Sequence, residues 1–167
     1  FWHRARAKRL VPRLRNWNED KIISGFAGYK VGMTHLTLMD DSDSPSKGQE
    51  VARPVTIIEV PPLFVYAVNA LKLTSEGWKQ FYQVVSINAP KEAKRVMTPA
   101  KKANSFESIE KESEYQLRLL VLTQPWKINL KKTPEIIEIP LSGAKEEQLQ
   151  TAKNLLGKEL GVNDVLK

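Results

Sequence analysis

The amino-acid sequence predicts a mainly β protein with an α+β insertion, whose first strands form part of a β-barrel that is incomplete in this chain. Three observations lead to this fold class. About four strand-like segments follow one another in the first half, separated by glycine, proline or polar turns. Short helices and further strands come next. After the last predicted helix no strand follows that could close a barrel, which leaves an open sheet edge.

The first four predicted strands mix β-branched, aromatic or long apolar residues with polar ones. They span residues 33–40, 54–60, 64–71 and 78–87. A polar loop at 40–48 separates the first two, and Pro61 ends the second because proline cannot donate into a β-ladder. The third strand is apolar on both faces, so we expect it to be covered on each side.

Beyond residue 89 the pattern changes. Residues 105–112 predict a short helix with acids in its first turn and with Asn104 or Ser105 as its N-cap. Two further strands are predicted after it, at 117–123 and 135–139. This order of elements predicts a small α+β subdomain inserted into the barrel.

A last helix is predicted after Ser142, whose side chain is expected to cap it. Gly157 lies where a helix commonly ends on a left-handed residue. One stripe of the helix is apolar, which predicts a buried face. The stripe consists of Leu149, Ala152, Leu155 and Leu156.

We therefore expect three parts. Residues 1–24 form a basic arm, 25–88 the first strands of the β-barrel, and 89–167 the α+β insertion subdomain. The chain starts at Phe1 rather than at a methionine and stops at Lys167 without a terminal tail, so we expect it to be a piece of a longer polypeptide.

Positive charge is concentrated in the first twenty-one residues, which carry +5 of the chain's formal net charge of +7. Pro12 and aromatic residues such as Trp17 are interleaved, and such a segment cannot be buried without leaving cations unpaired. Phosphates form the densest anionic surface, so we expect this arm to bind nucleic acid in a salt-dependent way. The cations are Arg4, Arg6, Lys8, Arg9, Arg13, Arg15 and Lys21.

The composition excludes several classes of site. A hydrophobic content of 41% permits a core, while the absence of cysteine excludes disulfides, thiolate zinc sites and cysteine nucleophiles. No apolar run approaches the length that spans a bilayer, and no signal-peptide pattern follows the basic residues. We therefore expect a cytoplasmic protein without a membrane partner.

The glycines Gly25, Gly28 and Gly32 lack the spacing of a dinucleotide-binding loop and the ending of a phosphate loop. Backbone geometry is the favoured interpretation. The alternative is that glycine lets the backbone approach RNA, while Lys30 and His35 meet phosphate or sugar.

No metal site is predicted. Asp40, Asp41 and Asp43 resemble the start of a calcium loop, but the required glycine and glutamate positions are not matched, so we expect a solvated acidic turn. His3 and His35 are the only histidines and have no third ligand at a suitable spacing.

Nor do the residues predict an enzyme. No serine triad is recognisable, and the pair Glu107 and Glu110 falls on a short polar helix, where a solvated face is the favoured interpretation. We therefore predict no catalytic residues, no cofactor and no small-molecule substrate.

Secondary basic clusters occur at Lys101-Lys102, at Lys127 and at Lys131-Lys132, where we expect weak phosphate contacts. Trp126 could stack on a base or pack against the preceding strand, and packing is favoured.

Several segments resemble one family, large-subunit ribosomal protein three in its archaeal and eukaryotic form. The most specific is Phe-Ala-Gly-Tyr-Lys-Val-Gly-Met-Thr-His at 26–35, which is similar to a signature near the start of that family. The arginine-rich start at 1–9 is also similar. Further segments in the family's order are 54–62, 119–126 and 155–160. The acidic loop at 40–48 and the compact insertion favour the archaeal branch.

The resemblance implies a translation-protein-type β-barrel and a structural, non-enzymatic constituent of the large ribosomal subunit in the cytoplasm. It implies binding to large-subunit ribosomal RNA, a role in assembly and translation, and contacts with neighbouring large-subunit ribosomal proteins. The cations of the arm and Trp17 would contact RNA, and Lys30, Thr34 and His35 would lie where the barrel meets RNA. The alternative is a soluble translation or RNA-processing factor with a basic arm.

Overall fold

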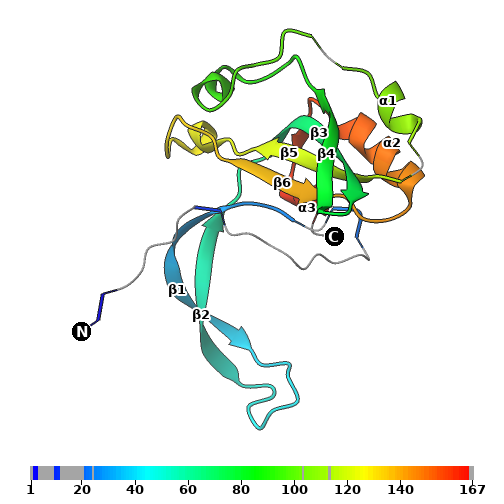
Figure 1. Ribbon diagram of the computed structural model, residues 1–167. Coiled ribbons are helices and arrows are strands. Elements are labelled where there is room, and N and C mark those ends of the chain that lie inside the picture. Colours follow the sequence, from blue (N-terminus) through cyan, green and yellow to red (C-terminus); the bar gives the residue numbers. More distant parts are fainter. Residues whose placement is uncertain are drawn as a thin grey trace. The chain divides into compact units, whose positions relative to one another are not determined.

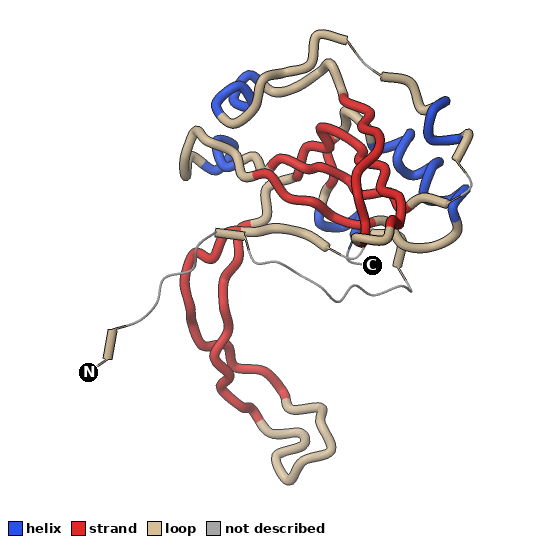
Figure 2. The backbone as a smooth tube through the Cα atoms, viewed as in Figure 1, coloured by secondary structure: helices blue, strands red, loops and turns tan. Residues whose placement is uncertain are grey.

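The computed structural model describes residues 2–3, 10–11, 21–23, 25–102, 104–112 and 114–165. These residues are mainly β, as predicted, and their strands form one two-stranded and one five-stranded sheet (Figures 1 and 2). Residues 27–60 form one compact unit, here named the hairpin unit, and the rest of the chain forms a second, the sheet unit. Both sheets are open, so a β-barrel stays a prediction.

The hairpin unit is a long antiparallel ribbon of β1 (Tyr29–Met39) and β2 (Glu50–Glu59) (Figure 1). The register runs from Tyr29 opposite Glu59 to Met39 opposite Glu50, with a bulge between Lys30 and Gly32. Each strand starts about four residues before its predicted start, because ladder hydrogen bonds extend the pair through residues of low strand propensity such as Lys30, Gly32 and Glu50.

Gly28 allows a close approach at the base of this ribbon. A Cβ atom there would lie 2.5 Å from Ile58 Cγ2 and 2.7 Å from Val60 Cγ1, closer than side chains tolerate. Nothing lies within 4 Å of the equivalent position at Gly32. The backbone interpretation of the glycine series is therefore confirmed at Gly28.

In the sheet unit the strand order is β4-β3-β5-β6, and β7 also pairs with β3. All pairs are antiparallel. The strands are β3 (Leu63–Thr74), β4 (Gly77–Val85), β5 (Gln116–Leu122), β6 (Ile136–Pro140) and β7 (Glu159–Leu160). The first nine residues of β3 are buried, which confirms the prediction that this strand is covered on both faces. The sheet joins strands from both sides of residue 88, where the sequence predicts a domain boundary; the boundary stays a prediction.

The helices of the sheet unit lie around this sheet (Figure 1). Two are 3-10 helices, η1 (Lys91–Arg95) and η2 (Pro125–Ile128), and three are α-helices, α1 (Glu107–Glu110), α2 (Lys145–Leu155) and α3 (Val162–Val165). In the predicted stripe of α2, which packs against β5, Ala152 is fully buried and the three leucines are half-buried. Gly157 has φ +76°, as its predicted role at a helix end requires.

The predicted helix caps are wrong. The residues that precede α1 and α2 are Phe106 and Ala144, and neither helix has a side-chain cap hydrogen bond. Asn104 instead donates its Nδ2–H to the carbonyl of Gln83, at 2.9 Å. The Ser142 N–H donates to the carbonyl of Ile22, at 3.0 Å. The Asn104 side chain therefore bonds to a partner distant in sequence, and Ser142 lies two residues before the residue that precedes α2.

Replacing Leu119 by alanine is expected to lower the free energy of unfolding by about 2–5 kcal/mol, because this fully buried side chain of β5 would leave a cavity. The matched control is Leu73→Ala at the 57% exposed end of β3, with an expected change within about 0.5 kcal/mol. Urea unfolding followed by circular dichroism measures both. Equal losses would show that β5 is not the centre of the core.

Candidate nucleic-acid interface

Most of the predicted arm contacts lie outside the residues that the structure describes. These are Arg4, Arg6, Lys8, Arg9, Arg13, Arg15 and Trp17. The described members of the predicted site are Lys21, Lys30, Thr34 and His35, and all four are exposed. The last three lie on β1 of the hairpin unit.

The register of the hairpin divides these three residues between its two faces. Lys30 is opposite Ile58 and His35 is opposite Pro54, so both belong to one face. Thr34 is opposite Val55 and belongs to the other. The bulge beside Lys30 causes this grouping, because the extra residue shifts the alternation that would otherwise pair Lys30 with Thr34. The structure therefore brings Lys30 and His35 to a common surface.

Large apolar side chains on both strands of the hairpin are exposed to an extent unusual for residues of this type. Val31 is 66% exposed, Met33 64%, and Ile58 55%. A two-stranded ribbon of this kind buries little apolar surface by itself. Its faces therefore offer a mixture of cationic, polar and apolar groups.

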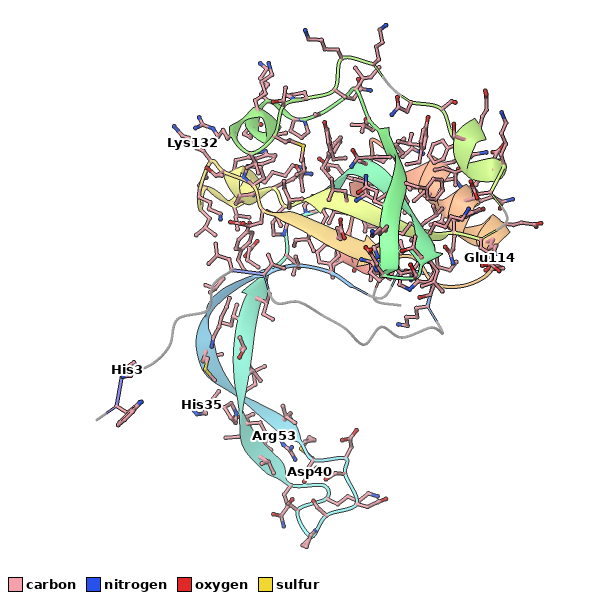
Figure 3. The ribbon with its side chains drawn as sticks, in the orientation of Figure 1. His3, His35, Asp40, Arg53, Glu114 and Lys132 are labelled. Carbon is pink, nitrogen blue, oxygen red and sulfur yellow. The ribbon has the colours of Figure 1, made fainter. Side chains whose placement is uncertain are left out.

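At the tip of the hairpin, a group of serines surrounds the carboxylate of Asp40. Ser42 donates its N–H and its hydroxyl to Oδ1, at 3.1 and 2.6 Å. Ser44 and Ser46 donate their hydroxyls to Oδ2, at 2.8 and 2.5 Å. Arg53 Nη2 lies 3.7 Å from Oδ1. Figure 3 shows Asp40 and Arg53 at this end of the ribbon.

The expectation of a solvated turn is therefore wrong for Asp40, which is only 4% exposed. The hydroxyl of Ser42, followed by those of Ser46 and Ser44, holds the pKa of the Asp40 carboxyl well below its ordinary value of 3.8. The sequence carries a signal for this arrangement, since serines follow Asp40 at every second position.

The secondary basic clusters lie in the sheet unit. Lys127 bonds to Glu159 at 2.6 Å, and this hydrogen bond lowers the pKa of Glu159 below its ordinary value. Lys131 pairs with Glu135, whereas Lys101 and Lys102 are exposed.

The described part of the chain contains neither a metal-binding cluster nor a membrane-spanning helix. No group of three or more His, Asp or Glu side chains there is placed to hold a metal ion. No described helix is long and apolar enough to cross a bilayer. The surfaces that remain are the mixed faces of the hairpin and the basic loops of the sheet unit.

Comparison with known proteins identifies relatives along the whole chain. The family model described as Ribosomal protein L3 matches residues 1–167. Large ribosomal subunit protein uL3 of Nanoarchaeum equitans is 38% identical and aligns with 100% of this chain and 53% of its own length. Proteins of the same name from Methanobrevibacter smithii and Archaeoglobus fulgidus are 39% and 40% identical, over 99% of this chain and 52% of their own lengths. The chain spans about half the length of the curated relatives it matches.

The Asp40 carboxylate is expected to stay ionised in the folded chain at pH values where an ordinary aspartate is protonated. Its pKa is lowered on folding, so its contribution to hairpin stability is complete above pH 3.8 and is lost as the pH falls further. An NMR titration of the Asp40 carboxyl carbon and the Ser42 amide measures this. Asp40→Asn should shift the Ser42 amide already at pH 7 and abolish its acid transition. A carboxyl midpoint at or above 3.8 would contradict the assignment.

Proposed function

The chain belongs to the ribosomal protein L3 family, and from this membership we propose that it is a structural constituent of the large ribosomal subunit. In this role it binds large-subunit ribosomal RNA and supports assembly and translation, in the cytoplasmic ribosome and without enzymatic activity. One observation carries the proposal: the family match extends over residues 1–167, and archaeal relatives named as large-subunit proteins align with essentially all of the chain.

The basic arm supports RNA as the partner. Its seven cations stand against only two acids within twenty-one residues, and each phosphate that a cation neutralises releases a condensed counterion. We assign the phosphate contacts to the arginines and lysines of the arm, including Lys21, and a stacking contact to Trp17. These contacts position the chain on RNA without reading its sequence.

The hairpin supports a second set of contacts. Lys30 and His35 are exposed on one face, where a cation and an imidazole can meet phosphate or a ribose hydroxyl. Thr34 would reach RNA only from the other face. We therefore propose that Lys30 and His35 act together and that Thr34 contacts a separate strand of RNA.

The exposed apolar residues of the hairpin support the finer fold assignment, a translation-protein-type β-barrel. An isolated two-stranded ribbon is marginally stable, and further strands paired with its two free edges would stabilise it. Neighbouring large-subunit ribosomal proteins are the proposed protein partners of the remaining surface. We propose neither a membrane nor a small-molecule partner.

Sedimentation of native cell extract tests the structural role. An antibody to this chain should detect it with the large subunit on a sucrose gradient, before and after a high-salt wash at constant magnesium. A cycling translation or RNA-processing factor would leave in the wash, because affinity that depends on phosphate contacts falls steeply with salt. Absence from ribosomal fractions before the wash would refute any stable ribosomal role.

Replacing Arg4, Arg6, Arg9, Arg13 and Arg15 by glutamine is expected to weaken RNA binding. The salt dependence of log affinity should fall by about 0.7–0.9 for each arginine that no longer neutralises a phosphate. Replacing the same arginines by lysine is the matched control, since it keeps the charge. Filter binding at several salt concentrations measures the slopes, and the thermal midpoint should change little in both variants. A large drop in stability would show instead that the arm belongs to the core.

A further inference from the structure

The sheet unit contains a cleft of about 540 Å³ between two segments that are far apart in the sequence. One wall is η1 and the other is η2 with the loop that follows it. Figure 3 shows Lys132 at this edge of the unit, beside η1. The side chains that matter for its chemistry are Glu92, Arg95, Trp126, Asn129, Lys131 and Lys132. The volume falls within the range of about 300–1,000 Å³ that is usual for small-ligand sites.

A buried alanine fixes the first wall. Ala93 of η1 is fully buried in a cluster with Phe64, Tyr66, Ala67 and Leu122 of the sheet. In a 3-10 helix, residues three apart lie on the same side, so Glu92 and Arg95 face the cleft together. The helix therefore presents one carboxylate and one guanidinium from a backbone that the core holds in place.

The second wall is fixed in a similar way. Pro125 is buried, and the N–H of Leu130 donates to its carbonyl at 3.1 Å. Asn129 ends η2 in the left-handed conformation, with φ 55°. Trp126 and Asn129 are three residues apart and both line the cleft. Trp126 is half-buried, so the packing predicted from the sequence accounts for only part of its indole.

The cleft carries cations without local partners. Arg95 and Lys132 are exposed, and neither forms an ion pair with any residue that the structure describes. Lys131 differs, because it pairs with Glu135. The segment 91–102 adds four lysines beyond Arg95, and its single acid is Glu92 of the cleft. Glu92, Arg95 and Lys132 together carry a charge of +1, so an anionic ligand would find net positive charge beside a half-buried aromatic ring.

We propose that this cleft binds one unpaired RNA nucleotide, with its base stacked on Trp126 and its phosphates on Arg95 and Lys132. An indole face stacks on any base, and Asn129 and Glu92 can hydrogen-bond to a base edge. The inference rests on the proposed function and extends it: RNA contacts the sheet unit at a site separate from the arm and the hairpin.

The combination of groups favours an unpaired nucleotide over two other ligands. In an RNA duplex the bases stay stacked on one another and cannot occupy the indole face, so a duplex would use only the cations. An acidic peptide would likewise neutralise Arg95 and Lys132 but leave the indole without a stacking partner. Selectivity for single strands, dependent on Trp126, is therefore the distinguishing property.

The first test measures the binding of a fluorescein-labelled 12-nucleotide oligouridine and of a 12-base-pair RNA duplex by fluorescence anisotropy. The background is the complete chain with the five arm arginines changed to glutamine, so that arm contacts do not mask the cleft. Trp126→Leu should weaken single-strand binding about tenfold and leave duplex binding unchanged. The matched control is Trp78→Leu, a 48% exposed tryptophan on β4, which should change neither.

A second pair of variants tests the phosphate contacts. Arg95→Gln with Lys132→Gln should reduce the salt slope for the single strand by about 1.4, since two cations no longer neutralise phosphates. Lys111→Gln with Lys158→Gln removes the same charge from exposed positions outside the cleft lining and should leave the slope unchanged. Equal effects of the two pairs would show that only the overall charge matters and would overturn the proposal.

Ultraviolet cross-linking of the oligouridine to the unsubstituted chain avoids any dependence on variants that fail to fold. A cross-linked nucleotide in the peptide that contains Trp126 supports the cleft, and cross-links confined to other peptides overturn it. Displacement of the RNA by an oligoglutamate peptide at equal concentration would also overturn it.

The cleft can fail while the proposed function stands. This is the result if the cleft variants bind RNA normally, while the unsubstituted chain sediments with the large subunit and the arm variant binds RNA weakly. If the unsubstituted chain binds no RNA, the proposed function itself fails.

Discussion

The organisation of the sheet unit depends on one strand, β3, which pairs with β4 along one edge and with β5 and β7 along the other. Its first nine residues, Leu63–Leu71, are buried, so the polar side chain of Asn69 among them must be satisfied within the sheet. Asn69 accepts a hydrogen bond from Gln83 at 2.7 Å and donates to Glu138 at 3.0 Å. This chain of hydrogen bonds links β4, β3 and β6, and a one-residue slip in any of them would break it. These polar contacts therefore fix the register of strands whose pairing is otherwise apolar.

The cationic surfaces follow from how the backbone beneath them is held. In the cleft, the buried Ala93 and Pro125 hold η1 and η2 in place. The three-residue repeat of a 3-10 helix then puts Glu92 with Arg95, and Trp126 with Asn129, on the side that lines the cleft. In the hairpin, the bulge beside Lys30 selects which face that residue shares. In both places a feature with no charge of its own determines where the charge lies.

The loop at the tip of the hairpin is ordered by polar contacts. A two-stranded ribbon has no core, so its loop cannot be ordered by apolar burial. Asp40 orders it instead, because its carboxylate accepts four hydrogen bonds from nearby serine groups and lies near Arg53. The acidic residues that resembled a calcium loop thus include one with a local structural role, and the oxygen atoms of its carboxylate are already engaged by donors.

The sequence by itself determined the properties that depend on neighbours along the chain. The existence and order of the longer strands and the left-handed Gly157 were predicted correctly, because alternation and turn chemistry are local. Tertiary structure alone decided the features that depend on distant partners. Asn104 is not a cap because its side chain bonds to Gln83, and Ser142 is not a cap because α2 begins only after Ala144. Trp126 lines the same cleft as Arg95 because the buried Ala93 and Pro125 hold η1 and η2 in place. Periodicity reports which face of an element is apolar, but not which other element will lie against it.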